Sequence, residues 1–347
     1  MEATFIRNAW YVAAWASEVP AGQIISRQIL GVPLALYRTE SGIIGALEDR
    51  CPHRGVPLSL GCVIKDRLRC GYHGLWFDET GHCVEIPGQD KIPPGMKTQS
   101  YPVVERDALI WIWCGDPEKA DQESIPSFPW HNDPAWPYIP YVQRIACAYN
   151  LVVDNLLDQT HLPYVHASTI GGSAMGQATA DMDVEKTPRG MRFMRWTEKT
   201  TPPPAYVAAG IGMVEDQLID RWSEFEYVAP GTVLQFVGGL PLEARARETG
   251  AREGGWALRI MHNITPETET SCHYFWASCN GFKPDQPETT QWLHDQTRET
   301  FYDDEIFLEA QQRRITERPG PLIPTRHDIA RVVADGAMKK MLKDENR

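Results

Sequence analysis

The stretch CPHRGVPLSLGCVIKDRLRCGYHG, residues 51–74, decides the fold of the first third of this chain. It contains two short pairs of metal-binding side chains, Cys51 with His53 and Cys70 with His73, and sixteen residues separate the pairs. Two cysteines and two histidines are the ligands of a [2Fe–2S] centre in which imidazoles replace thiolates on one iron, but they can also hold a structural zinc ion. Paired zinc ligands usually have two to four residues between them, so the single residue between Cys51 and His53 favours the iron–sulfur centre.

The segments on both sides of this motif are typical of a small antiparallel β domain. Before it, the apolar runs QIISRQIL, PLALYR and IIGALE are separated by turn residues. After it, a Pro-rich turn leads to the alternating run ALIWIW, in which Leu109, Trp111 and Trp113 share one face. The following GDPEKADQESIP has the composition of a linker. We therefore expect a first domain over residues 1–118 and a second over residues 119–347.

The segments CPHRG and CGYHGLWFDETGHC resemble the Rieske motif of aromatic-ring oxygenases. Rieske proteins of the respiratory bc type are similar but carry two further cysteines, at the positions that Val56 and Tyr72 occupy here. The resemblance therefore implies the oxygenase or ferredoxin kind, without the clamping disulfide. Cys62 and Cys83 are then expected to be buried apolar side chains and not ligands.

Composition and charge exclude some classes of partner. The formal net charge is −12, whereas nucleic acids and anionic membranes attract clusters of Lys and Arg. No apolar run is long enough to span a bilayer, and the start MEATFIRNAW lacks the pattern of a signal peptide. We therefore expect neither nucleic acid nor a membrane as partner, a cytoplasmic location, and eight reduced, buried or metal-bound cysteines.

A second metal motif lies in NLLDQTHLPYVH, residues 155–166, where Asp158, His161 and His166 have D-x2-H-x4-H spacing. Two histidines and one carboxylate are the ligands that select non-haem Fe(II) with open positions. Five residues correspond to about 140° around an ideal helix, so the two imidazoles cannot converge on a regular helix. We predict an irregular helix here, kinked at Pro163 or containing a π-bulge. Two histidines satisfied at a helix end are the alternative.

The third ligand is predicted from the helical pattern ETTQWLHDQTRETFYDDEIFLEAQQRRI. Its apolar stripe contains Leu293, Phe301, Leu308 and Ile315. Asp304 lies on this stripe, whereas Asp303 and Glu305 lie off it. A carboxylate on a buried face is costly unless it is paired or binds a metal, which favours Asp304. The segment DDEIFLEAQ also resembles the region from which oxygenases of the vanillate demethylase type draw their carboxylate.

Antiparallel β runs separate these two helical regions. In WALRIMHNI, strict alternation places Trp256, Leu258, Ile260 and His262 on one face, which we expect to line a cavity under the long helix. A histidine on an apolar face is more often a satisfied core residue than a functional one. The block HNITPETETSCHYFW is similar to its counterpart in the vanillate and methoxybenzoate demethylase branch. This resemblance implies that His262 contacts a substrate carboxylate, with Gln235 as a second contact.

The resemblance extends over nearly the whole chain and implies a Rieske non-haem iron oxygenase of α+β class. Its N-terminal antiparallel β Rieske domain would be followed by a helix-grip catalytic domain with a curved antiparallel sheet. The implied reaction is O2 activation at mononuclear Fe(II), with hydroxylation of a methoxy carbon of a vanillate-like or methoxybenzoate-like acid and release of formaldehyde. Because no G-x-G-x-x-G opens a βαβ unit, NAD(P)H electrons would arrive through a separate flavin and iron–sulfur reductase.

Roles are also expected for two polar residues near the iron, the first of them in line with the resemblance. Asp158 would hydrogen-bond His161 through its carboxylate and connect it to the partner subunit's His73, which implies a homotrimer. Asn155, one turn before Asp158, is expected to be a polar group beside the iron, or else a helix cap.

Two other functions stay open from the sequence: a dioxygenase that makes cis-diols, and a Rieske electron carrier whose second domain only binds a ligand. The loops near residues 171–180 and 200–212 are either lids over the iron or ordinary surface loops.

Overall fold

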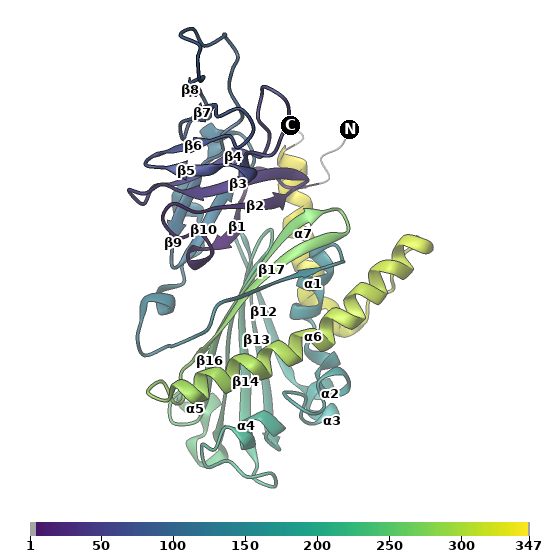
Figure 1. Cartoon of the computed structure of the whole chain (residues 1–347). Helices are drawn as coiled ribbons and strands as arrows, with labels where there is room; N and C mark the ends of the chain where they lie inside the picture. Colours follow the sequence, from purple (N-terminus) through teal and green to yellow (C-terminus); the bar gives the residue numbers. More distant parts are fainter. Residues whose placement is uncertain (1–4, 346–347) are drawn as a thin grey trace. The chain divides into compact units, whose positions relative to one another are not determined.

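The computed structural model describes residues 5–345, and these form two compact units that are treated separately here (Figure 1). The first unit ends at Ser127 and also includes Thr265–Glu269, and the second comprises the rest of the chain from Phe128 onward. The expected boundary near residue 118 lies earlier in the same connecting segment. The first four residues of MEATFIRNAW, which the expectation about a signal peptide concerns, lie outside the described residues.

The first unit contains three small antiparallel sheets. Their orders are β1-β10-β9, β2-β3-β4 and β5-β6-β7-β8. The strands are β1 Trp10–Trp15, β2 Ile24–Ile29, β3 Val32–Arg38, β4 Ile44–Glu48, β5 Cys62–Ile64, β6 Arg67–Arg69, β7 Trp76–Phe77, β8 Cys83–Glu85, β9 Val103–Arg106 and β10 Leu109–Trp113. The β runs predicted on both sides of the Cys/His motif are therefore confirmed. Short 3-10 turns lie at Ala16–Glu18, Leu58–Leu60, Pro117–Lys119 and Gln122–Ser124.

Strand β10 is the central strand of its sheet and is buried on both faces. All five of its residues are buried, including Ile110 and Ile112, which lie opposite the predicted face of Leu109 and Trp111. Alternation therefore identified the strand correctly but did not separate a buried face from an exposed one.

The second unit is built on a seven-stranded sheet with the order β11-β17-β16-β15-β14-β13-β12. The strands are β11 Tyr141–Ile145, β12 Asp181–Thr187, β13 Gly190–Thr200, β14 Ile219–Val228, β15 Thr232–Pro241, β16 Trp256–Thr268 and β17 Ser271–Asn280. The pairings from β12 to β16 are antiparallel and join neighbours in sequence. The edge strand β11 instead pairs with β17, which comes much later in the chain.

Helix α6, Pro287–Glu317, lies across one face of this sheet (Figure 1). The other helices are α1 Tyr149–Leu157, α2 Leu162–Val165, α3 Ala174–Thr179, α4 Pro204–Ala208, α5 Ala246–Thr249 and α7 Ile329–Glu345, and 3-10 turns lie at Pro129–Asn132, Gln159–His161 (η6), Leu242–Ala244 and Arg326–Asp328. The predicted stripe is confirmed for Leu293, Phe301, Asp304 and Leu308, which are all buried on α6. Ile315, near the C-terminal end of α6, is only partly buried.

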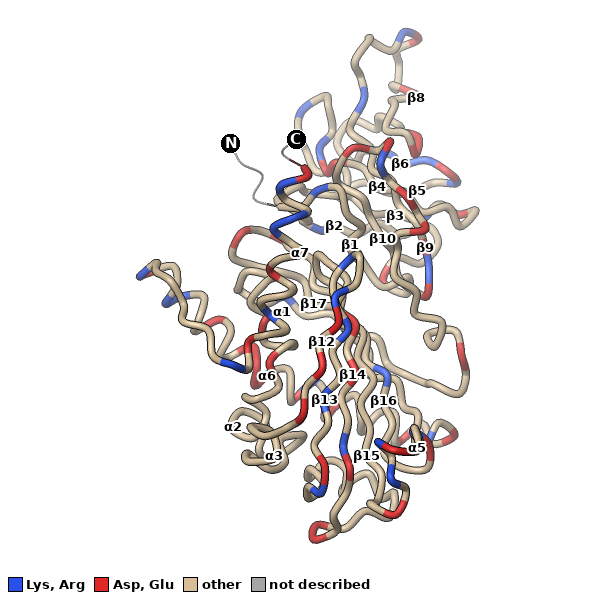
Figure 2. The backbone as a smooth tube through the Cα atoms, turned by 180° about the vertical axis from the view of Figure 1, so that it is seen from behind, with Lys and Arg blue, Asp and Glu red and all other residues tan. Residues whose placement is uncertain are grey.

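Acidic and basic residues are interspersed along the described chain (Figure 2). Strands β12, β13 and β14 each carry acidic and basic residues. Among the described residues, no helix is both long enough and apolar enough to cross a membrane.

Candidate metal centres and substrate cavity

The helix that contains the second metal motif is interrupted at Asp158. Helix α1 ends one residue earlier, and Asp158 itself is extended, with φ −110° and ψ 106°. Its carboxylate accepts hydrogen bonds from the backbone N–H and the hydroxyl of Thr160, at 2.8 and 2.7 Å, and so caps the 3-10 turn η6. The predicted irregular helix is confirmed. The break is at Asp158 and not at Pro163, which occupies the first turn of α2, where proline is tolerated.

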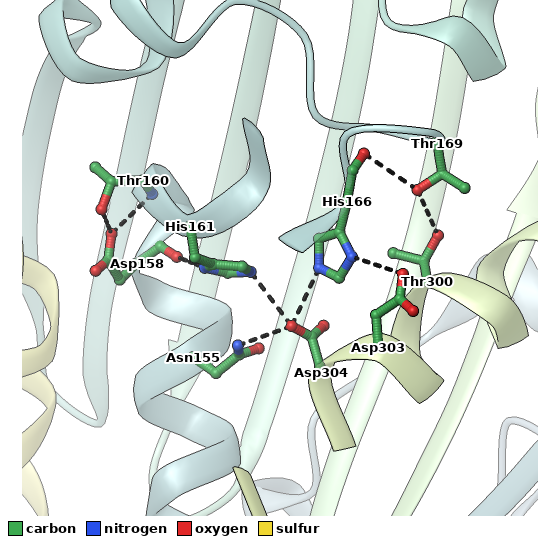
Figure 3. Close-up of polar contacts among 9 residues, drawn as sticks. All are labelled: Asn155, Asp158, Thr160, His161, His166, Thr169, Thr300, Asp303 and Asp304. Atoms are coloured by element: carbon green, nitrogen blue, oxygen red, sulfur yellow. Dashed lines mark hydrogen bonds and ion pairs between the residues drawn. The ribbon is translucent and has the colours of Figure 1, made fainter. Parts of the chain in front are cut away.

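This interruption brings His161 and His166 to one carboxylate of α6. The Nε2 atoms of His161 and His166 lie 3.4 and 3.1 Å from Oδ1 of Asp304 (Figure 3). One ligand atom from each residue lies within 4.8 Å of the other two. Ligand atoms about 2.1 Å from one ion and at right angles to each other are roughly 3 Å apart. The spacing therefore suits one shared metal ion.

The environment of Asp304 also suits a cation. Its side chain is buried, and none of the described Lys or Arg residues forms an ion pair with it. The amide of Asn155 donates to Oδ1 of Asp304 at 3.0 Å and so fixes the orientation of the carboxylate. A buried carboxylate without a positive partner costs several kcal/mol, and a bound metal ion would remove this cost.

The Nδ1 atoms of the two histidines have different partners. Nδ1–H of His161 donates to the backbone carbonyl of Asp158 at 2.5 Å, which leaves the lone pair of Nε2 directed at the metal position. The prediction that the Asp158 carboxylate hydrogen-bonds His161 is therefore wrong, because Nδ1 of His161 is already bonded to the backbone carbonyl of Asp158, while Oδ1 of the carboxylate caps η6. Nδ1 of His166 lies 3.6 Å from Oδ2 of Asp303, a neighbour that the sequence analysis did not identify.

One contact holds the segment after His166 against α6, and a second lies within that segment. The hydroxyl of Thr300 donates to that of Thr169 at 3.2 Å, and Thr169 in turn contacts the carbonyl of His166 at 3.5 Å (Figure 3).

Burial lowers the pKa of His161, and the nearby Asp304 opposes this shift. A neutral imidazole is the form that binds a metal.

A mostly apolar cavity extends from this triad along the sheet under α6. Its volume is about 80 Å³, several times the roughly 10–15 Å³ that one buried water needs. Trp256, Leu258 and Ile260 line it, as the alternation of β16 predicted, and Gln235 lines it from β15. Ala205 and Tyr206 of α4 also contribute to the wall, so part of the loop near residues 200–212 encloses the cavity.

His262 lies behind Gln235 and is not among the residues that line the cavity. Its side chain is fully buried, with Nδ1 2.6 Å from the Tyr274 hydroxyl and Nε2 2.9 Å from Oε1 of Gln235. Burial lowers the pKa of His262 to about 3, so the ring is neutral at physiological pH. In this arrangement His262 positions Gln235. The expected direct contact between His262 and the substrate stays a prediction.

The buried neutral His262 predicts a specific pH dependence of stability. Below the unfolded pKa of about 6.5 the unfolded chain takes up a proton that the folded chain cannot, so this histidine lowers stability as pH falls toward about 3. The contribution is about 2 kcal/mol between roughly pH 7.5 and pH 5. We expect His262→Asn to lose less stability than the wild type over this interval in urea unfolding followed by tryptophan fluorescence.

The matched control is His82→Asn, which alters an exposed histidine and should leave the pH dependence of the wild type unchanged. Identical pH dependence in His262→Asn and wild type would show that His262 does not stay neutral in the folded chain.

The Cys/His motif of the first unit forms two loops with the same local structure. In one, the backbone N–H of Gly55 donates to the carbonyl of Cys51 at 2.8 Å, and in the other Gly74 donates to Cys70 at 3.1 Å. Both glycines have φ of +72°, which disfavours any residue with a side chain. The repeated turn explains why each ligand pair is followed by glycine.

These loops bring the two histidine rings close together and bury the two cysteines. Both cysteines are buried, whereas His53 and His73 are exposed, with ring centroids 4.7 Å apart. None of the eight cysteines, all of which are described, forms a disulfide, so the expected absence of a clamp is confirmed. Cys83 is buried in the core as expected, and Cys62 only partly so.

Both halves of the chain match known protein families. Residues 9–102 match the Rieske [2Fe-2S] domain, and residues 145–344 match the vanillate O-demethylase oxygenase C-terminal domain. The chain belongs to the Rieske non-haem iron oxygenases. This oxygenase is the terminal component of a monooxygenase system that depends on a separate reductase, as the sequence predicted.

Curated relatives of this oxygenase are similar over nearly their full length. The toluene-4-sulfonate monooxygenase iron–sulfur subunit TsaM1 of Comamonas testosteroni is 36% identical, with 99% of this chain and 98% of the relative covered. The oxygenase component of dicamba O-demethylase from Stenotrophomonas maltophilia is 38% identical over 90% and 89%. A vanillate O-demethylase oxygenase subunit from Pseudomonas sp. (strain HR199 / DSM 7063) is 37% identical over 91% and 88%.

Solved structures agree with the fold of this oxygenase. Dicamba monooxygenase bound to 3,6-dichlorosalicylic acid superposes with a TM-score of 0.91 at 35% identity, with 99% of each chain covered. Another structure of dicamba monooxygenase, with non-haem iron and dicamba, has a TM-score of 0.79 at 32% identity over 99% of each chain. The predicted fold class and the two predicted cofactors, a [2Fe–2S] cluster and a mononuclear iron, are confirmed.

Proposed function

We propose that this oxygenase hydroxylates a methoxy or methyl carbon of a single-ring aromatic acid of the vanillate or methoxybenzoate kind. The observation that supports this most is the convergence of two histidines and one aspartate at an apolar cavity. Iron bound there supplies open positions at which O2 can react beside the substrate. Hydroxylation of a methoxy carbon gives a hemiacetal, which releases formaldehyde and a phenol.

The proposed site residues follow from the geometry described above. The mononuclear iron is held by His161, His166 and Asp304, and the cluster by Cys51, His53, Cys70 and His73. Asn155 keeps the Asp304 carboxylate in its orientation. The electrons come from NAD(P)H through a flavin and iron–sulfur reductase.

The residues of the cavity wall position the substrate and exclude water. Leu258, Ile260 and Phe301 provide apolar surface, against which an aromatic ring buries its faces. Gln235 adds a polar contact, and its position is fixed by His262. Together these groups hold the ring while one substituent faces the triad.

Sequence identity to the relatives does not by itself indicate the substrate. The relatives described for toluene-4-sulfonate, dicamba and chloroacetanilides are 36%, 38% and 36% identical, although their substrates differ. The descriptions of the first two as monooxygenase or demethylase components support monooxygenation over cis-diol formation. The convergent triad argues against a simple electron carrier.

We expect formaldehyde from the purified oxygenase, loaded with both iron centres, when it is mixed with a surrogate reductase, NADH and 4-methoxybenzoate, 3-methoxybenzoate or vanillate. The amount of formaldehyde should equal the amount of phenol formed. Asp304→Ala should abolish both products because it removes one of the three iron ligands. A cis-diol product without formaldehyde would establish the dioxygenase alternative instead.

The proposed assembly is a homotrimer with head-to-tail contacts, in which Asp158 holds His161 through its backbone carbonyl and reaches the partner subunit's His73 through its carboxylate. Asp158 is suitably placed at the end of α1, and it is partly buried beside the first iron ligand. Its Oδ1 is used by Thr160, and Oδ2 is available for a further contact. A cytoplasmic location stays a prediction.

Asp158→Asn tests this link because an asparagine oxygen can still accept from Thr160 and cap η6. We expect both metals to remain bound, while single-turnover electron transfer between them falls roughly 10- to 100-fold. The control Thr160→Val removes only the hydroxyl contact and keeps both the Asp158 charge and the backbone N–H bond that caps η6, so it should transfer electrons nearly as fast as the wild type. Wild-type transfer in Asp158→Asn would contradict the proposed link.

A further inference from the structure

One cationic side chain lines the cavity beside the iron site. Of the described residues in its wall, Arg221 is the only Lys or Arg. It lies on β14, where it pairs with Gly239 of β15, and it is 94% buried, with 6% of its surface exposed. Charged side chains are almost never this buried unless they are paired.

Arg221 has no anionic partner among the described residues. No carboxylate lies within ion-pair distance of its guanidinium, and its Nε has no hydrogen-bond partner. The guanidinium lies 5.3 Å from the centre of the Tyr206 ring. On another side it approaches Gly172, in the segment that follows the iron ligand His166. An unpaired buried charge costs several kcal/mol, so the site is incomplete without an anion.

A second buried arginine increases the positive potential. Arg195 of β13 is 3% exposed and donates to the carbonyl of Gln177. Burial, together with the charge of Arg221, lowers the pKa of Arg195 to about 10, although Asp158 opposes the shift. Arg195 is therefore still charged at neutral pH. An anion at Arg221 would reduce the repulsion between the two arginines.

Gln235, one of several side-chain amides that line the cavity, lies at a different place from Arg221. Gln235 is four residues from Gly239, the cross-strand partner of Arg221, which corresponds to about 13 Å along the strand. Gln235 contacts His262, and the ring of His262 lies 5.7 Å from the ring of Phe301. Phe301 lies about one helical turn before Asp304 on α6. Arg221 and Gln235 therefore address different parts of a bound molecule.

The contact between Nε2 of His262 and Oε1 of Gln235 further separates the roles of Gln235 and Arg221. A neutral His262 that donates from Nε2–H to Oε1 of Gln235 leaves the amide NH2 as the free group of Gln235. One neutral amide donor suits a hydroxyl or ether oxygen, whereas a guanidinium matches the paired oxygens of a carboxylate or sulfonate.

We propose that Arg221 is the residue that selects the acidic group of the substrate, a carboxylate or sulfonate on a single aromatic ring. This inference rests on the proposed function, because it assumes that the reacting molecule occupies this cavity. Tyr206, stacked on Trp256 at 4.4 Å between ring centres, provides an aromatic wall beside the anion site. Arg221, and not His262, then determines the preference for an acid.

Binding without turnover tests the proposal. Dissociation constants would be measured by calorimetry, with O2 excluded, for toluene-4-sulfonate, 4-methylbenzoate and the neutral 4-methylbenzamide. The wild type should bind at least one anion roughly 10- to 100-fold more tightly than the amide, the range for a charge-assisted hydrogen bond. The anion that binds more tightly identifies whether Arg221 prefers a sulfonate or a carboxylate on the substrate.

Variants assign this preference to one side chain. Arg221→Met should remove the preference for the anion, whereas Gln235→Leu should keep it. The matched control Arg192→Met removes an exposed arginine of β13 and should behave as the wild type. Arg221→Gln replaces Arg221→Met if the latter does not fold, as judged by circular dichroism.

Three results would overturn the proposal: equal wild-type affinity for anions and amide, a preference that survives in Arg221→Met or Arg221→Gln, or a preference lost only in Gln235→Leu. Because no turnover is involved, absence of formaldehyde in the earlier assay together with an Arg221-dependent preference would count against the proposed reaction alone.

Discussion

The iron site depends on the hydrogen bonds between the Asp158 carboxylate and Thr160. These bonds stabilise an extended residue between α1 and η6, where a continuous helix would point His161 and His166 in different directions. The same residue uses its backbone carbonyl to fix the ring of His161. A local interruption of one helix therefore sets both the position and the tautomer of a ligand, and α6 supplies the remaining carboxylate, Asp304.

Much of this arrangement could be predicted because it follows from spacing. The distance of five residues between the histidines required an irregular helix, and the position of Asp304 on an apolar stripe marked it as the third ligand. The position of the break could not be predicted, since Pro163 is the stronger sequence signal but fits the first turn of α2 without strain. Asp303 was missed because its contact with His166 depends on how α6 packs.

Arg221 and His262 show a second limit of sequence reasoning. Alternation separates faces only where one face is exposed, and Ile219, Asp220, Arg221 and Trp222 are all buried on β14. An arginine in such a run does not stand out as a cavity residue. His262 was correctly placed on the face of Trp256 and Ile260, but whether it or Gln235 reaches the cavity depends on side-chain lengths and on Tyr274 behind it. Substrate recognition is therefore less predictable than metal binding, in keeping with relatives of similar identity that are described for different substrates.

We infer that the second unit holds its own iron at His161, His166 and Asp304. The iron content of the fully loaded protein, measured together with acid-labile sulfide in wild type and in Asp304→Ala, tests this inference. A [2Fe–2S] cluster contributes two iron atoms, so we predict three per chain in the wild type and two in the variant, with unchanged sulfide. Two iron atoms per chain in the loaded wild type, or three in Asp304→Ala, would show that this triad is not the iron site.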